Sequence, residues 1–147
     1  MSLHSPHRAV IYFFCVIVLL LTSLQAQPAR ILRNINVGDD FPAFSVLDLE
    51  GKVIDSAGSK GKPMILLFVR PGQKESLHAL DLVQEIHRNR SKDGLVVLAL
   101  SSKPDSRAFL EKVRSERKLT FDLALDPDRK LYGDLGLVVS PTTLLVD

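Results

Sequence analysis

The hydrophobic positions of this chain begin with one long uninterrupted run. Thirteen apolar residues, Ala9 to Leu21, follow a short segment whose only charged residue is Arg8. A short apolar run behind a positive charge is typical of a secretory signal, and it falls short of the roughly twenty residues that span a bilayer. We expect residues 1–26 to be a signal peptide, with an uncleaved N-terminal membrane anchor as the alternative. Residues 27–36 are then a linker, and the domain that follows is exported to the periplasm or another extracytoplasmic space.

Later apolar positions follow strand patterns. One segment alternates between apolar and polar residues up to a Glu-Gly-Lys turn and then resumes, which predicts a β-hairpin. Two further segments are continuous apolar runs of the kind found in strands buried on both faces, and the first of them is predicted to be a central strand. The predicted strands cover residues 44–49, 53–54, 64–69, 95–100, 119–125 and 142–146.

The segments between these strands have apolar residues at helical spacing. Apolar residues recur every third position within residues 73–90, which places them in one stripe along a helix. Ser102 precedes the start of a second helix, and a short helical segment is expected around Leu131 and Tyr132. Strands that alternate with helices in this way predict an α/β domain of three layers.

Composition narrows the possible functions. The 147 residues include 19 Lys+Arg and 17 Asp+Glu, a net charge of +2, without the strong basic excess that binding to a phosphate backbone needs. Nucleic acid is therefore not an expected partner. The single cysteine is Cys15, inside the first apolar run, and we interpret it as apolar filler. Residues 16–147 then offer no thiol for a disulfide, a nucleophile or a metal ligand. No metal, phosphate or nucleotide motif is present, and we expect no cofactor.

Several short motifs stand in a characteristic order. They are Val37–Phe44 (VGDDFPAF) before the hairpin, Gly61–Pro63 before the first continuous strand, Tyr132–Gly133, and Ser140–Thr143 (SPTT) at the last strand. With them, residues 37–147 resemble the thioredoxin-like superfamily, in particular its redoxin branch. That branch includes the alkyl hydroperoxide reductase/thiol-specific antioxidant (peroxiredoxin) family and exported thiol-disulfide oxidoreductases. The resemblance implies a thioredoxin-like fold with an N-terminal β-hairpin and, for the family, oxidoreductase or antioxidant activity in cell redox homeostasis.

The chain departs from this family at the catalytic cysteines. In the family, the first buried strand leads into a loop with a catalytic cysteine, commonly in a C-x-x-C pair at the start of the next helix, where the helix N-terminus lowers the thiol pKa. The corresponding loop here reads Arg70, Pro71, Gly72, Gln73. We interpret it as a degenerate active-site loop and expect no catalytic residue in this chain.

Two alignments of this loop remain open. If the end of the strand is aligned, Gln73 and Ser76 fall near the cysteine positions, and if the helix is aligned, Val69 and Gly72 fall there. Neither alignment supplies a sulfur atom.

Other polar side chains near the loop have ordinary interpretations. Ser76 lacks an adjacent base, and we interpret it as a helix-start residue. His78 and His87 lie about 180° apart around a helix, so they cannot share a metal ion, and we expect both to be solvated. Arg70 is expected at the surface, although a cation beside a helix N-terminus could also bind an anionic ligand.

This chain also departs from the family after its last predicted strand. Family members continue into another strand and a helix that cover one face of the sheet, whereas this sequence stops at Asp147. We expect the closing C-terminal strand and helix to be missing, which would leave apolar surface exposed, and a fragment is the simplest explanation.

One feature of the family does not depend on sulfur. The resemblance implies that Pro141 follows a cis bond and that Ser140 offers its backbone to an extended substrate segment, although a tight turn is the alternative. We interpret the protein as an exported thioredoxin-like domain that is not catalytic and binds a protein or peptide near Ser140 and Pro141. Two alternatives stay open: the N-terminal portion of a longer thiol-disulfide oxidoreductase or thiol peroxidase whose cysteine lies elsewhere, and a structural module tethered to the membrane by its N-terminal segment.

Overall fold

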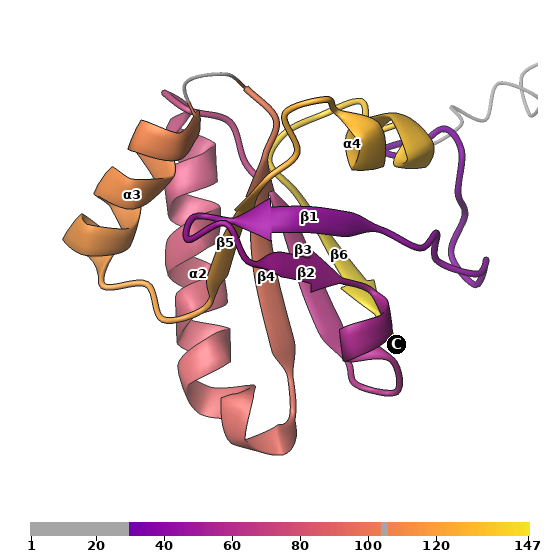
Figure 1. Cartoon of the computed structure of the whole chain (residues 1–147), viewed down its shortest axis with the longest axis horizontal. Helices are drawn as coiled ribbons and strands as arrows, with labels where there is room; N and C mark the ends of the chain where they lie inside the picture. Colours follow the sequence, from indigo (N-terminus) through magenta and orange to yellow (C-terminus); the bar gives the residue numbers. More distant parts are fainter. Residues whose placement is uncertain (1–29, 104–105) are drawn as a thin grey trace, which may run out of the picture.

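The fold is built on one β-sheet with helices on both of its faces (Figure 1). The computed structural model describes residues 30–103 and 106–147, so the predicted signal segment and Cys15 lie outside the described residues. In chain order, the strands are β1 (Ser45–Asp48), β2 (Val53–Asp55), β3 (Met64–Phe68), β4 (Val96–Ser101), β5 (Asp122–Leu125) and β6 (Thr142–Val146). The helices are α2 (Lys74–Arg90), α3 (Ser106–Arg117) and α4 (Lys130–Leu135), with short 3₁₀ turns η1 (Ala57–Ser59) and η2 (Ser91–Asp93).

The six strands form a mixed sheet in the order β2-β1-β5-β4-β3-β6. Strands β3, β4 and β5 run parallel, whereas β6 is antiparallel to β3 and β1 is antiparallel to β5. Phe68 at the end of β3 pairs with Leu100 of β4 on one side and with Thr142 of β6 on the other. The carboxyl ends of the three parallel strands therefore meet at one edge of the sheet, and the loops that follow them lie close together.

The continuous apolar run of β3 supplies both faces of the sheet. Ile65 and Leu67 belong to the core that α2 and α3 cover, while Leu66 and Phe68 belong to the core beneath α4 and residues 32–44. Figure 1 shows α2 and α3 together on one side, away from α4. The predicted three-layer α/β arrangement with an N-terminal hairpin is confirmed.

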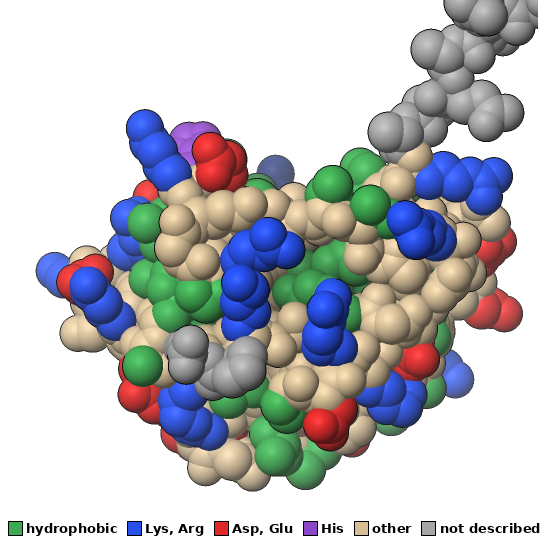
Figure 2. Space-filling model, turned by 90° about the horizontal axis from the view of Figure 1, so that it is seen from above, with side chains coloured by type: hydrophobic (Ala, Val, Ile, Leu, Met, Phe, Trp, Pro, Cys, Tyr) green, Lys and Arg blue, Asp and Glu red, His purple; other side chains and the backbone are tan. Residues whose placement is uncertain are grey.

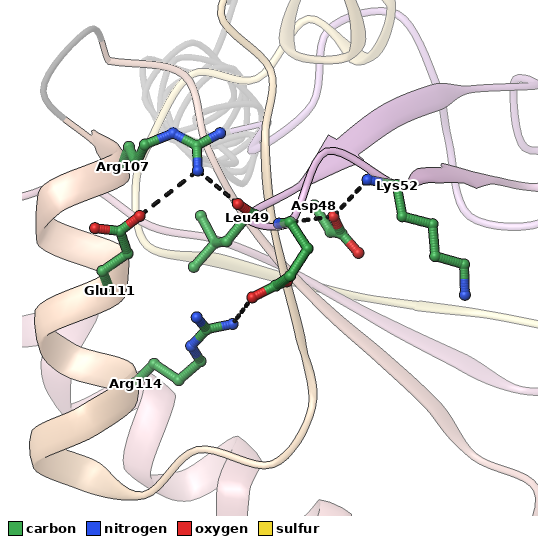
Figure 3. A network of polar contacts seen from close by, with 7 residues as sticks. Asp48, Leu49, Lys52, Arg107, Glu111 and Arg114 are labelled. Atoms are coloured by element: carbon green, nitrogen blue, oxygen red, sulfur yellow. Dashed lines mark hydrogen bonds and ion pairs between the residues drawn. The ribbon is translucent and has the colours of Figure 1, made fainter.

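The turn of the β1–β2 hairpin is fixed to α3 by a polar network (Figure 3). The Asp48 carboxylate accepts the backbone N–H groups of Glu50 and Lys52 at 2.9 and 2.7 Å, which closes the turn. Arg107 of α3 donates to the Leu49 carbonyl at 2.6 Å, and Arg114 pairs with the Glu50 carboxylate at 2.7 Å. The hairpin is thus held against the helix on the face of the sheet opposite α4.

Two strand predictions need correction. The strand expected over residues 119–125 begins only at Asp122, because Leu119 and Phe121 are buried in the connection from α3 rather than in the sheet. Strand β3 is not central, since only β6 lies beyond it, and β4 and β5 are nearer to the middle.

Residues before the hairpin, expected to be a linker, pack on the domain. Leu32 forms a β-bridge with Leu137, and the backbone of Arg33 donates to the Gly136 carbonyl at 3.1 Å. Leu32 and Ile35 contact the core beneath α4. The segment from residue 31 to 36 is therefore part of the folded unit.

Strand β6 forms one edge of the sheet in the described chain. Leu145, which pairs with Ile65 on the face that carries α2, is 75% exposed. Apolar surface is thus accessible beside β6. None of the helices in residues 30–103 and 106–147 combines the length and apolar content needed to cross a membrane.

Candidate functional site

The candidate site lies at the edge where the parallel strands end. Arg70 follows β3, Ser102 and Lys103 follow β4, and Arg129 follows β5. Together with Ser140 they border a cavity of about 170 Å³, which is lined, within the described residues, by Val69, Arg70, Ser102, Lys103, Arg129, Tyr132 and Ser140. Viewed from above (Figure 2), the molecule shows Lys and Arg side chains around a hollow in which hydrophobic side chains are visible.

The loop expected to hold the catalytic cysteines joins β3 to α2. Gln73 is the N-cap of α2, and Ser76 is the third residue of the helix. The Ser76 hydroxyl is fully buried, accepts the Arg70 N–H at 3.0 Å and donates to the Gln73 side-chain oxygen at 3.2 Å. The expectation that Ser76 starts the helix is therefore wrong: it closes the loop from inside the first turn.

The predicted loop residues do not all face the cavity. Arg70 is exposed and lines it together with Ser140, whereas Pro71, Gly72 and Gln73 do not contribute to its lining. The structure thus brings together one residue of the degenerate active-site loop and one of the two residues expected to bind a substrate.

Ser140 and Pro141 precede β6 and are joined by a cis peptide bond. The Ser140 hydroxyl donates to the Phe68 carbonyl at 3.3 Å, and the Thr142 hydroxyl donates to the Val139 carbonyl at 2.8 Å. These two bonds fix the segment against the end of β3.

The backbone of Val139 and Ser140 is only partly used. Neither the N–H group of Val139, nor the N–H or carbonyl of Ser140, makes a hydrogen bond to another residue within the described parts of the chain. Ser140 is half-buried, while Val138 and Val139 are 46% and 50% exposed. An extended segment can therefore reach donor and acceptor groups here, with apolar side chains beside them.

Four polar residues at the site were not predicted as functional: Ser102, Lys103, Arg129 and Tyr132. Tyr132 served only as a landmark of the resemblance, and the two cations lie in loops distant in sequence. Tyr132 is buried, packs edge-to-face on Phe68 with ring centroids 4.9 Å apart, and donates its hydroxyl to the Val69 carbonyl at 3.4 Å. The order of the parallel strands is the signal that would have placed these loops together.

Burial, together with the negative charge of Asp126, raises the pKa of Tyr132 to about 12, and this outweighs the nearby Ser102 hydroxyl and the positive charges of Arg129 and Arg70, which lower it. The Arg129 guanidinium lies 5.7 Å from the centre of the Tyr132 ring. The phenol is therefore neutral at physiological pH and acts at the site as a hydrogen-bonding group rather than as a base.

We predict a pH dependence from this shift. The pKa of Tyr132 is higher in the folded protein than its value of about 10 in the unfolded chain, so the neutral phenol favours the folded state. That contribution is complete below about pH 10 and is lost as the pH rises towards 12. In a Tyr12→Phe variant, where Tyr132 is the remaining tyrosine, phenolate absorbance should appear about two pH units later in the folded than in the urea-unfolded protein. Coincident titrations would contradict the burial of this phenol.

The described residues contain no group of three or more His, Cys, Asp or Glu side chains that could hold a metal ion. His78 is exposed, as expected. His87 is not solvated as predicted: it is half-buried, with its Nδ1 atom 3.2 Å from the Thr120 hydroxyl and its ring packed edge-to-face on Phe121. Both histidines are accounted for without a ligand.

Comparison with known proteins identifies the family and the fold of this chain. Residues 37–147 match the AhpC/TSA family. The thiol-disulfide oxidoreductase ResA of Bacillus thuringiensis (strain Al Hakam) is 30% identical over 119 residues, which cover 78% of this chain. The chain spans 66% of the length of that relative, just under two thirds.

Solved structures agree with this assignment. The thioredoxin domain of a thiol-disulfide oxidoreductase from Bacteroides vulgatus is similar with a TM-score of 0.68 at 20% identity, covering 77% of this chain and 82% of that one. A secreted disulfide oxidoreductase from Mycobacterium tuberculosis, homologous to E. coli DsbE, gives a TM-score of 0.63 at 18% identity, with coverage of 69% and 74%. These similarities establish a thioredoxin-like fold. Together with the match over residues 37–147, they show that the chain belongs to the AhpC/TSA family.

Proposed function

We propose that this protein is a redoxin-type thioredoxin-like domain that binds an extended protein or peptide segment instead of catalysing thiol exchange. The absence of cysteine from residues 16–147 supports the non-catalytic part of the proposal, since thiol-disulfide exchange needs a thiolate. Where the family has its cysteines, this chain has Gln73 and Ser76 in one alignment and Val69 and Gly72 in the other. None of these four residues can form a thiolate.

The Val139 N–H and the N–H and carbonyl of Ser140, which make no hydrogen bond within the described residues, carry the binding part of the proposal. Addition of a strand needs only main-chain donors and acceptors for affinity, and neighbouring pockets for specificity. The exposed side chains of Val138 and Val139 supply apolar contact, and the cavity beside Ser140 accepts a side chain of the bound segment.

An extracytoplasmic location fits this proposal. One similar structure is of a protein described as secreted, and the apolar run Ala9–Leu21 has the pattern of an export signal. We place the partner in the same compartment.

A second candidate function rests on the surface beside β6. Leu145 is 75% exposed on the side of the sheet that carries α2, and Leu82 and Ile86 of α2 are 49% and 42% exposed. Such surface supports a further strand and helix that close the sheet, as the family resemblance implies. In that case this chain is the N-terminal portion of a longer thiol-disulfide oxidoreductase or thiol peroxidase.

The binding proposal predicts the effect of a Val139→Pro substitution. Proline removes the Val139 N–H without adding charge, so a peptide that uses this donor should bind about tenfold more weakly, the equivalent of one hydrogen bond. Peptides are selected from a random library displayed on phage, and their affinity is measured by fluorescence anisotropy. Val139→Ala serves as the matched control, because it trims the same side chain but keeps the backbone N–H, so Val139→Pro should bind about tenfold more weakly than Val139→Ala. Failure to select any peptide, or full affinity in Val139→Pro, would contradict the proposal.

A further inference from the structure

The cavity beside Ser140 is strongly basic. Among the described residues, its charged groups are Arg70, Lys103 and Arg129, which come from three separate loops and are all exposed. Six ion pairs join described residues, and none of them involves these three side chains. Three cations around one small cavity repel one another, so an anion placed among them is stabilised by all three.

One of the cations, Arg129, lies over the Tyr132 ring in the cavity wall. Arg129 lies 5.7 Å from the centre of the Tyr132 ring, and both Arg70 and Arg129 act electrostatically on the Tyr132 hydroxyl. The acidic group that approaches this place is Asp126, but its carboxylate is buried and accepts the backbone N–H of Tyr132 at 3.0 Å. Asp126 therefore organises the start of α4 and leaves the cavity itself electropositive.

The other polar groups of the cavity are hydroxyls. The Ser102 hydroxyl can donate to an anion. The hydroxyls of Tyr132 and Ser140 donate to the Val69 and Phe68 carbonyls, and their lone pairs can accept from the surrounding guanidinium groups. Arginine presents paired N–H donors in a plane, a geometry that matches the two oxygens of a carboxylate.

The size of the cavity limits its occupant. Pockets for whole small molecules usually measure about 300–1,000 Å³, whereas this cavity measures about 170 Å³. It is large enough for one side chain. Because it borders Ser140, that side chain can belong to a segment paired with the backbone of Val139 and Ser140.

We propose that the cavity binds the carboxylate of an aspartate or glutamate in the bound peptide, between Arg70, Lys103 and Arg129. The inference rests on the proposed function and adds the chemical class of the partner: an acidic extended segment. Main-chain pairing supplies general affinity, and the carboxylate fixes the register of the segment against Ser140.

Selection of a random peptide library displayed on phage against the full-length protein tests this inference. We expect Asp or Glu to be enriched at one position. In a selected peptide, replacing that Glu by Gln should weaken binding about tenfold or more, because hydrogen bonds between charged groups are stronger than those to a neutral amide. Raising the salt concentration should weaken the Glu peptide more than the Gln peptide.

Matched variants of the protein separate local from general charge effects. Arg129→Gln and, independently, Arg70→Gln should remove the preference for Glu and leave the affinity of the Gln peptide unchanged. Arg88→Gln makes the same change in net charge at an exposed position of α2 and should keep the preference. Peptides selected without an acidic residue, or a preference that survives both Arg129→Gln and Arg70→Gln, would overturn this inference while the proposed function stands. Failure to select any peptide would overturn both.

Discussion

A Gln73→Cys/Ser76→Cys variant is expected to accelerate the reduction of insulin by dithiothreitol on the order of tenfold above the buffer rate, whereas the wild-type protein adds nothing to that rate. The two side chains already touch, because the Ser76 hydroxyl donates to the Gln73 side-chain oxygen at 3.2 Å. Gln73 caps α2 and Ser76 lies in its first turn. Thiols at these positions have C-x-x-C spacing, and the positive end of the helix would lower their pKa.

The alternative alignment of the loop provides the matched control. A Val69→Cys/Gly72→Cys variant has the same spacing but should gain nothing. The first cysteine of the pair, which has to attack the substrate disulfide, would be buried at Val69, which is 1% exposed, whereas Gln73 is half-buried. Gly72 has φ +76°, which a cysteine adopts only with strain. All variants are made in a Cys15→Ser background, which removes the native thiol. Activity of the unsubstituted protein above the blank, or a gain confined to the second pair, would contradict our interpretation of the loop.

The layered fold could be predicted because the pattern that predicts each strand lies within a short continuous stretch of sequence. A continuous apolar run such as Met64–Val69 has to be buried on both faces, and β3 indeed divides its side chains between two cores. The residues at which a strand begins and ends are harder to predict from a short stretch of sequence. Residues 119–121 have a strand pattern but lie outside the sheet, because Leu119 and Phe121 are buried within the connection from α3 to β5, which satisfies the same pattern.

The residues of the candidate site could be predicted only where a sequence motif lies next to them. Ser140 and Arg70 were recognised from motifs next to them, and the structure places both at one cavity. Lys103 and Arg129 follow different parallel strands, so the three cations meet only once the order β5-β4-β3 is known. Ser76 illustrates a second limit, since helical position alone does not show whether a hydroxyl caps a helix or closes a loop.

The largest loss of stability is expected from Gly136→Ala, which should lower the free energy of unfolding by about 2–4 kcal/mol. Gly136 has φ +64°, and an added Cβ would lie 2.8 Å from the Arg33 Cβ and 2.9 Å from the Asn34 Cγ. The contact with the Arg33 Cβ cannot be relieved without moving the segment that covers the core beneath α4, and turning the Asn34 side chain away would break its bond to the Gly133 carbonyl at 2.9 Å. The Arg33 N–H bond to the Gly136 carbonyl, at 3.1 Å, would be strained by the same movement. Urea unfolding followed by circular dichroism measures the change, since the chain has no tryptophan.

Gly94→Ala separates the two causes of this loss of stability, which are the positive φ and the close contacts of the added Cβ. Gly94 has φ +84° but nothing within 4 Å of an added Cβ, so the substitution should cost only the backbone penalty of about 1 kcal/mol. Equal losses for the two variants would show that contact with Arg33 and Asn34 does not matter. A larger loss at Gly136 would instead mean that residues 31–36 are held by close backbone approach. Because Gly136 leads directly into Val138–Ser140, Gly136→Ala should also weaken peptide binding, whereas Gly94→Ala should not, which ties this packing of the N-terminal segment to the proposed function.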